Sequence, residues 1–247
     1  KIAKIIQASM LPGNFPPFPD RNEFDIFASM VPAKEVGGDL YDFFFVTDNK
    51  FCFLIGDVSG KGVTAALFMV RSLTLIKSEA LRQNEDISPE LVFNNVNNAL
   101  AENNEENLFI TSFIVIVDLK TGLIEYSNAG HNPPMIKKND QENFEYLKIR
   151  KNFVMGAMPD IRYKKESFTL NPGDYFFLYT DGVTEAMNCE AKQYSEKRLE
   201  SLLTSTNELT VNHLLKMVSQ DIEHFVQDTP ASDDITMLAF KYKGNLT

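Results

Sequence analysis

Twelve residues, FCFLIGDVSGKG at positions 51–62, decide the fold. The run from Phe51 to Val58 is apolar and of strand length, and Asp48-Asn49-Lys50 before it has the composition of a hairpin turn. Three glycines then mark a tight loop, and from Val63 the apolar residues recur at the helical period. We therefore expect a hairpin strand that ends in an acidic, glycine-rich loop and leads into a helix.

The elements outward from this stretch are strands joined by short turns, interrupted twice by helices. We expect strands at 24–31, 40–46, 110–118, 123–128, 133–137, 144–149, 162–169, 174–180 and 235–242, and helices at 2–11, from 63, from 89 with Ser88 as N-cap, and from 211 with Thr210 as N-cap. Short connections favour antiparallel sheets, with helices on their outer faces. The sequence predicts an α+β fold, with an N-terminal linker helix and proline-rich connector at 1–20 and one domain at 21–247.

Composition limits the class of protein. The chain has 247 residues, 44% of them hydrophobic, which is enough for a sizeable core. Its net charge of −10 disfavours a nucleic-acid partner, because an acidic surface repels phosphate backbones. Cys52 and Cys189 form no CxxC pair, and no apolar run is long enough for a bilayer. We expect a cytoplasmic protein without direct membrane insertion. Because the chain lacks an initiator methionine, we also expect a piece of something longer.

Acidic residues gather in four clusters at strand ends or glycine-rich turns. They are Gly37-Gly38-Asp39-Leu40-Tyr41-Asp42, Gly56-Asp57-Val58-Ser59-Gly60-Lys61-Gly62, Thr180-Asp181-Gly182 and Ser232-Asp233-Asp234-Ile235-Thr236. An Asp-Gly pair is also an ordinary turn, and a single such site is more often that. Carboxylates that meet at one sheet edge repel each other unless cations neutralise them, and hard oxygen ligands select Mg²⁺ or Mn²⁺.

Other chemistries lack support in the sequence. The loop after Asp57 has isoleucine where a nucleotide-binding P-loop needs its first glycine, and Gly62 where it needs serine or threonine. His131 lies in a turn-like stretch, where a lone histidine is more often structural. Ser59 has no neighbouring base in the sequence, so a serine triad is unsupported.

Taken together, six segments in order resemble one family across nearly the whole chain. They are residues 6–12 (IQASMLP), 35–43 (EVGGDLYDF), 56–62 (GDVSGKG), 128–134 (NAGHNPP), 180–186 (TDGVTEA) and 233–236 (DDIT). The chain resembles the SpoIIE/RsbU-type serine phosphatases, the bacterial branch of the PPM, or type 2C, protein phosphatases. The resemblance implies a four-layer α-β-β-α sandwich of two packed antiparallel sheets flanked by helices.

The resemblance also implies a catalytic centre with two ions, Mn²⁺ or Mg²⁺. In it Asp57 would bridge both ions and the carbonyl of Val58 would contact one. Asp181 and Asp233 would complete the first ion site, and Asp39 would serve the second. Asp234, the other member of its pair, is a further candidate ligand or the residue that organises the turn, and Asp42 is a candidate for support behind the ligands. Asp57 and Asp181 are the residues expected to be essential for catalysis, with His131 a weakly supported general acid.

The implied activity is hydrolysis of a phosphoserine or phosphothreonine on a signalling protein by a metal-activated water. In this branch the usual substrate is an anti-sigma-factor antagonist, and such domains usually follow a sensor or receiver domain. The helix at residues 2–11 fits a connection to such a domain, or a homodimer. Two alternatives stay open: a catalytically silent regulatory module of the same fold, and a hydrolase of small phosphate esters. Lys34 is the only cation just before Gly37, and its role is open.

Overall fold

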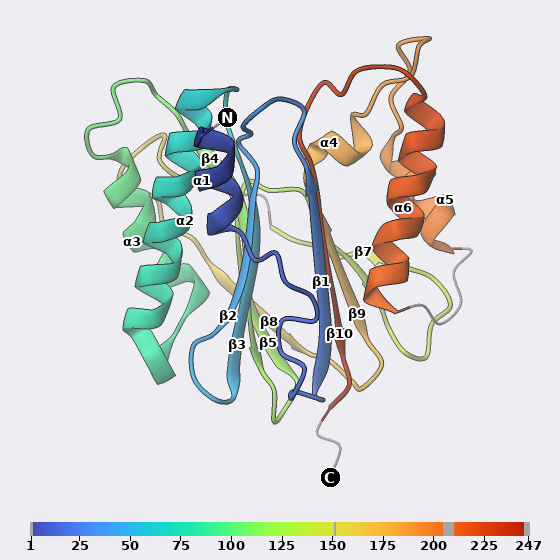
Figure 1. Ribbon diagram of the computed structural model, residues 1–247. Coiled ribbons are helices and arrows are strands. Elements are labelled where there is room, and N and C mark those ends of the chain that lie inside the picture. The colour runs from blue at the N-terminus through green and yellow to red at the C-terminus, as the bar shows by residue number, and fades with distance from the viewer. Residues whose placement is uncertain (1, 151, 205–209, 245–247) are drawn as a thin grey trace. The chain divides into compact units, whose positions relative to one another are not determined.

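The stretch at 51–62 forms the strand and loop predicted for it. The computed structural model describes residues 2–150, 152–204 and 210–244 (Figure 1). Strand β3 (Lys50–Val58) pairs antiparallel with β2 (Leu40–Phe45) through a hairpin, and on its other side with β4 (Ile110–Asp118). Every residue from Phe51 to Gly56 is buried, as expected of an unbroken apolar run in a central strand.

The chain divides into two compact units that interleave along the sequence. Unit 1 comprises Lys1–Gly13, Glu35–His131 and Ile149–Thr169, and unit 2 comprises Asn14–Lys34, Asn132–Lys148 and Leu170–Thr247. The predicted linker and connector at 1–20 is therefore shared, because its helix belongs to unit 1 and its proline-rich part to unit 2.

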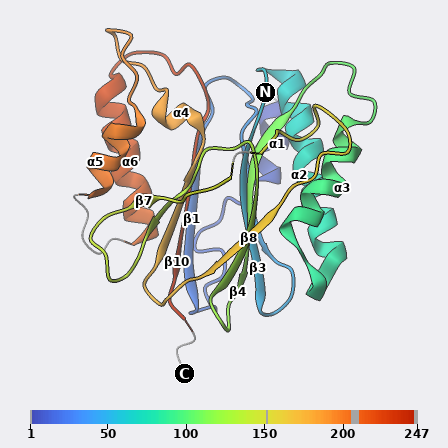
Figure 2. The same ribbon diagram turned by 180° about the vertical axis from the view of Figure 1, so that it is seen from behind.

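Unit 1 is a five-stranded antiparallel sheet with helices against one face (Figures 1 and 2). The strand order is β2-β3-β4-β5-β8, where β5 is Leu123–Ala129 and β8 is Lys165–Thr169. Its helices are α1 (Ile2–Met10), α2 (Val63–Gln83) and α3 (Pro89–Ala101), with a 3₁₀ turn at Asn84–Asp86.

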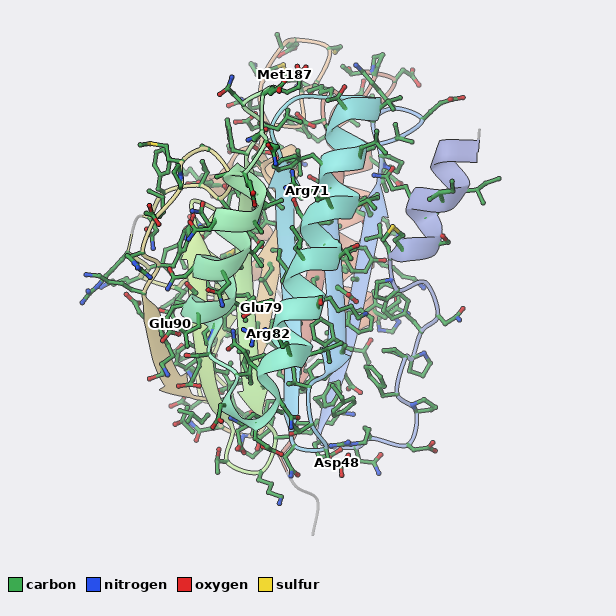
Figure 3. The ribbon with its side chains drawn as sticks, turned by 90° about the vertical axis from the view of Figure 1, so that its left-hand side faces the viewer. Asp48, Arg71, Glu79, Arg82, Glu90 and Met187 are labelled. Atoms are coloured by element: carbon green, nitrogen blue, oxygen red, sulfur yellow. The ribbon has the colours of Figure 1, made fainter. Side chains whose placement is uncertain are left out.

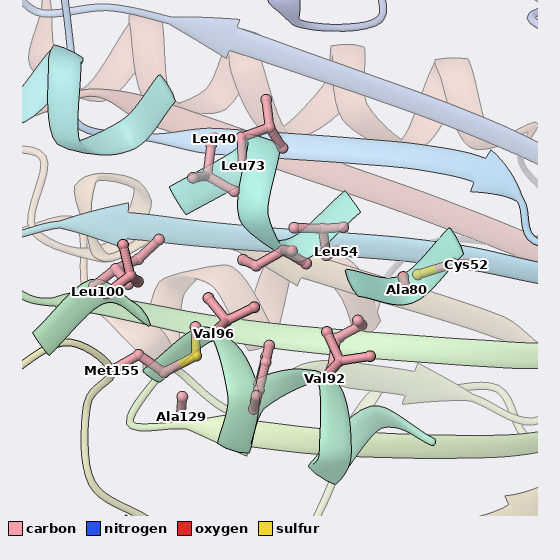
Figure 4. Close-up of a cluster of buried hydrophobic side chains, with 14 of the residues drawn as sticks. Leu40, Cys52, Leu54, Leu73, Ala80, Val92, Val96, Leu100, Ala129 and Met155 are labelled. Carbon is pink, nitrogen blue, oxygen red and sulfur yellow. The ribbon is translucent and has the colours of Figure 1, made fainter. Parts of the chain in front are cut away.

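Alternate residues of this sheet face α2 and α3. Figure 4 shows Cys52 and Leu54 of β3 packed with Leu73 of α2 and Val96 of α3. Cys52 is fully buried, and burial raises the pKa of its thiol well above its usual value, so it is a core residue.

Polar contacts fix α3 against α2. Figure 3 shows Arg71, Glu79 and Arg82 along α2. The Glu79 carboxylate accepts hydrogen bonds from Arg82 Nη2 (2.7 Å) and from Asn95 Nδ2 of α3 (2.6 Å). The bond from Arg82 lowers the pKa of Glu79 to about 2. Arg71 Nη2 donates to the carbonyl of Ala99 near the end of α3.

Unit 2 is built in the same way from a second antiparallel sheet of five strands. The order is β1-β10-β9-β6-β7, with β1 Phe24–Val31, β6 Met135–Lys137, β7 Glu145–Tyr146, β9 Tyr175–Tyr179 and β10 Ile235–Tyr242. Its helices are α4 (Asp181–Thr184), α5 (Glu196–Thr204) and α6 (Val211–Val226). Helix α6 packs on β1 and β10, and Thr210 caps it by accepting the His213 N–H (3.2 Å).

The α+β class and its two antiparallel sheets flanked by helices are confirmed. Ser88 is the N-cap residue of α3 as predicted, although its hydroxyl donates to Glu90 Oε2 (2.6 Å) and does not cap the backbone. Asp181 follows strand β9 as predicted and is also the first residue of the short helix α4, which the sequence did not predict. Strand β8 is shorter than the predicted 162–169. Among the described residues, no helix combines the length and the apolar character that crossing a membrane requires.

Candidate functional site

In unit 1 the first two acidic clusters meet at one end of the β2–β3 pair. Leu40 lies opposite Gly56, so Asp39 and Asp57, the next residue on each strand, share this end of the sheet. The Val58 N–H donates to the carbonyl of Gly38 (3.3 Å). Asp39 is buried, with 2% of its surface exposed, and Asp57 is half-buried. This end of the sheet therefore brings together two of the predicted carboxylates.

Gly38 is the reason the two segments can approach so closely. A Cβ at this position would lie 2.8 Å from the carbonyl oxygen of Val58 and 3.4 Å from Asp57 Oδ1. Real Cβ atoms essentially never come within 3.0 Å of another heavy atom, so any side chain here would displace the strand end. The absence of a Cβ leaves the Val58 carbonyl and the Asp57 carboxylate beside the loop that carries Asp39.

A glutamine of α1 holds this loop from behind. Gln7 Nε2 donates to the carbonyl of Gly37 (2.7 Å), and the Gly37 N–H donates to Gln7 Oε1 (3.1 Å). The Gln7 side chain is buried. One side-chain amide thus satisfies both backbone groups of Gly37, two residues before Asp39. The sequence placed Gln7 in a matching segment without giving it a role.

Asp42 serves a different part of unit 1. Its Oδ2 accepts a hydrogen bond from Lys77 Nζ of α2 (2.9 Å), and its Oδ1 accepts the Phe43 N–H (2.8 Å). Burial raises the pKa of Asp42, and the Lys77 ammonium partly offsets that rise. Asp42 thus lies on the helix-facing side of β2 and fastens α2 to the sheet.

In unit 2 the other two acidic clusters meet in the same manner. The Thr180 N–H donates to the carbonyl of Thr236 (3.0 Å), and the Thr236 N–H donates to Thr180 Oγ1 (3.1 Å). A Cβ at Gly182 would lie only 1.9 Å from the carbonyl oxygen of Asp234. Glycine is therefore required where α4 passes the loop that carries Asp233 and Asp234.

The two members of the Asp233-Asp234 pair are placed differently. Asp234 is buried, and its Oδ1 accepts the Ala33 N–H that follows β1 (2.8 Å). Asp233 is half-buried, and its Oδ1 accepts the N–H of Asp234 (3.0 Å). The Asp234 carboxylate thus ties the loop before β10 to the end of β1, as expected of a residue that organises the turn.

The predicted ligands are all oxygen donors, and they are distributed over both units. Asp39, Asp57 and the Val58 carbonyl belong to unit 1, and Asp181, Asp233 and Asp234 belong to unit 2. Within the described ranges no group of three or more His, Cys, Asp or Glu side chains is placed to hold a metal ion. The residues present nevertheless fit a hard divalent cation, because carboxylate and carbonyl oxygens are the ligands that Mg²⁺ and Mn²⁺ prefer.

His131 lies in a hydrogen-bonded turn of unit 1 that reaches Asp57. Its N–H donates to Asn128 Oδ1 (2.8 Å), and its Nδ1 shares a hydrogen bond with Thr111 Oγ1 (2.9 Å). Thr111 lies opposite Asp57 in the β3–β4 register, and its hydroxyl donates to the Asp57 carbonyl (3.4 Å). These contacts connect the turn of His131, through Thr111, to the strand end that carries Asp57. The sequence carried no signal for Thr111, since its partners are distant along the chain.

Lys34, the only cation just before Gly37, is exposed and belongs to unit 2.

Comparison with known proteins agrees with these observations. The family model of Stage II sporulation protein E (SpoIIE) matches residues 47–243. Protein IcfG of Synechocystis sp. is 30% identical over 95% of this chain and 40% of its own length. Phosphoserine phosphatase RsbU of Bacillus subtilis is 31% identical over 91% of this chain and 65% of its own length. The chain thus spans about half the length of these curated relatives.

A solved structure extends the comparison to the fold. The SiaA-PP2C domain of Pseudomonas aeruginosa superimposes with a TM-score of 0.84 at 20% identity, covering 98% of this chain and 95% of that domain. The family model covers most of the sequence, and the superposition covers nearly all of the structure. The chain therefore belongs to the SpoIIE family, and its fold is that of a PP2C phosphatase domain.

Proposed function

We propose that this chain is a metal-dependent protein phosphatase that hydrolyses phosphoserine or phosphothreonine on a signalling protein. The observation that carries the proposal is the convergence of Asp39, Asp57 and the Val58 carbonyl around Gly38. Family membership adds weight, because the relative RsbU is named a phosphoserine phosphatase.

The proposed ligands are those that the sequence motifs indicate, for two ions of Mn²⁺ or Mg²⁺. Asp57 would be shared by both ions, and the carbonyl of Val58 would hold one of them. Asp181 and Asp233 would complete the ligands of the first ion, and Asp39 would serve the second. Asp234 holds the loop of Asp233 through its bond to Ala33. Such ions, when bound, stabilise charge on phosphoryl oxygens and lower the pKa of a water toward neutrality.

The residues around these ligands fix their positions. Gln7 holds the loop that precedes Asp39, and Thr111 with His131 holds the strand end that carries Asp57. Catalytic groups held by such secondary contacts keep their geometry through the reaction, which is the main contribution of a protein to phosphoryl transfer. In this proposal no side chain of the protein becomes phosphorylated.

The substrate and regulation follow the bacterial branch. We propose a phosphorylated anti-sigma-factor antagonist as substrate, a cytoplasmic location, and an upstream sensor or receiver domain. Helix α1 supports such a connection, because Ile5 is 66% exposed and Ile6 is 55% exposed. Two exposed isoleucines on one helix suit an apolar contact with a preceding segment, or with a second copy of the chain.

Phosphate release from a phosphoserine peptide tests the proposal. The chain should release phosphate in the presence of Mn²⁺ or Mg²⁺, and this release should stop when a chelator is added. The Asp57→Ala variant should fold but release no phosphate. Full activity in chelator, or in Asp57→Ala, would refute the metal mechanism. A folded wild-type chain that cannot hydrolyse any phosphoester would instead favour the catalytically silent module.

A further inference from the structure

A small basic pocket lies in unit 1, on the same sheet as the strand that carries Asp57. It has a volume of about 120 Å³ and is lined from β5, from β8 and from residues 149–150 and 152–164. Its polar lining consists mainly of Tyr126, Asn128, Arg150, Arg162, Lys164 and Glu166.

Cations outnumber acids in this pocket, although the chain as a whole has a net charge of −10. The single carboxylate, Glu166, accepts from the Tyr126 hydroxyl (2.7 Å) and pairs with Arg150 Nε (3.2 Å). Within the described part of the chain, Arg162 and Lys164 have no acidic partner. Two cations therefore remain uncompensated at one site, which favours an anionic ligand.

Hydrogen bonds to α3 hold residues 154–163, next to the pocket lining, in place. Asn97 Oδ1 accepts the Gly156 N–H (3.0 Å), and Asn94 Oδ1 accepts the Tyr163 N–H (2.9 Å). The Tyr163 hydroxyl in turn donates to the carbonyl of Val154 (2.9 Å). The backbone of this segment is therefore ordered before a ligand binds, which lowers the entropic cost of binding.

The size of the pocket and its surroundings indicate a protein ligand. Pockets for small organic ligands have volumes of about 300–1,000 Å³, so this one accepts a single carboxylate or phosphate group and is too small for a nucleotide. Phe153, which directly follows the lining residue Asn152, is 45% exposed, and Met158 of the same segment is 54% exposed. Arginine, phenylalanine and methionine are enriched at protein interfaces.

The pocket is also joined to the Asp57 end of the sheet by hydrogen bonds. Asn128 lines the pocket, and its Nδ2 donates to the carbonyl of His131 (3.2 Å). His131 bonds Thr111, whose hydroxyl reaches the Asp57 carbonyl. A group bound in the pocket therefore lies at the same end of this sheet as Asp39 and Asp57.

We propose that this pocket is a docking site for an acidic segment of the protein substrate. Arg162 and Lys164 bind one carboxylate of that segment, and exposed Phe153 contacts the flanking surface. The docking proposal rests on the proposed phosphatase function, since the pocket takes a segment of the same molecule that carries the phosphoserine.

Two phosphoserine peptides that differ only in their flanking residues test the docking site. One carries three glutamates beside the phosphoserine, and the other carries three glutamines. In Arg162→Gln/Lys164→Gln we expect kcat/KM for the glutamate peptide to fall at least tenfold, mostly through KM. Activity toward the glutamine peptide and toward p-nitrophenyl phosphate should stay unchanged. The control Lys120→Gln/Lys216→Gln lowers the net charge equally at exposed sites and should behave like the wild type.

Each other outcome has a defined meaning. The docking site would be overturned if the wild type and Arg162→Gln/Lys164→Gln had the same kcat/KM for the glutamate peptide. It would also be overturned if the double variant lost as much activity toward p-nitrophenyl phosphate as toward the glutamate peptide. Inorganic phosphate can also be added as a competitor. If a low concentration of phosphate abolished the preference of the wild type for the glutamate peptide over the glutamine peptide, the pocket would bind a free anion and the peptide proposal would be overturned. If the wild type hydrolyses no ester, the phosphatase proposal fails separately. In that case, fluorescence anisotropy of a labelled glutamate peptide still tests the pocket. Equal affinity of the wild type and Arg162→Gln/Lys164→Gln for this peptide would overturn the docking site.

Discussion

Gly182→Ala is the substitution for which the structure gives the largest steric consequence. A Cβ at residue 182 would lie 1.9 Å from the Asp234 carbonyl oxygen, and real Cβ contacts essentially begin at 3.0 Å. The separation must therefore grow by at least 1.1 Å. The obstructing atom belongs to the backbone, so a side-chain rotation cannot relieve the contact, and α4 or the loop of Asp233 and Asp234 must move.

The size of the effect follows from that displacement. Overpacking of a tightly packed site destabilises proteins by about 1–3 kcal/mol. A misplacement of about 1 Å in a catalytic constellation lowers activity by about 10²-fold. We expect Gly182→Ala to lose about that much activity toward p-nitrophenyl phosphate in Mn²⁺, and to unfold at a lower urea concentration than the wild type.

Gly13→Ala is the matched control. No heavy atom lies within 4 Å of a Cβ at Gly13, and this glycine has no positive φ. Its stability should stay within about 0.5 kcal/mol of the wild type. The steric reasoning is refuted if Gly182→Ala keeps both the wild-type unfolding midpoint and the wild-type rate.

Three further substitutions test individual contacts by urea denaturation. Gln7→Leu leaves both backbone groups of Gly37 without their partner, so it should destabilise the chain by about 1–3 kcal/mol and weaken Mn²⁺ binding. An unchanged Mn²⁺ affinity would contradict the positioning role of Gln7. Lys77→Met removes the cation beside buried Asp42, so the folded-state pKa of Asp42 rises further above its unfolded value. The variant should therefore be least stable near neutral pH and regain stability as the pH falls toward about 4. A loss of stability that does not change with pH would refute this reasoning. Thr210→Ala removes the N-cap of α6 and should cost about 0.5–2 kcal/mol, whereas an unchanged midpoint would show that the cap contributes nothing.

Elements with a strong periodic signal were predictable from the sequence. Strands β1, β4 and β10 have the predicted bounds, because each is an apolar run between turn residues. The prediction failed where the signal is weak. Strand β8 lies at the edge of its sheet with alternate residues exposed, so its bounds were overestimated, and α4 has only four residues, too few to show a helical period.

The contacts around the candidate ligands illustrate what a sequence does not contain. The order of the six motif segments indicated Asp39, Asp57, Asp181 and Asp233 as candidate ligands, because each lies in a short segment that can be recognised in the sequence together with the others. The bond from Gln7 to Gly37 joins residues 30 positions apart, so its existence depends on where the fold brings α1. The pocket cations belong to two basic groups near residues 150 and 164, which can be recognised in the sequence of an otherwise acidic chain. Their convergence on one pocket depends on strand register, which the sequence does not show.

Equilibrium binding of Mn²⁺, measured by electron paramagnetic resonance on wild type, Asp57→Ala and Asp181→Asn, tests the central claim most directly. We expect two Mn²⁺ ions per wild-type chain, and a loss of affinity of at least about 10²-fold in each variant while its unfolding midpoint shows a folded protein. Wild-type Mn²⁺ affinity in a folded Asp57→Ala or Asp181→Asn variant would contradict the account.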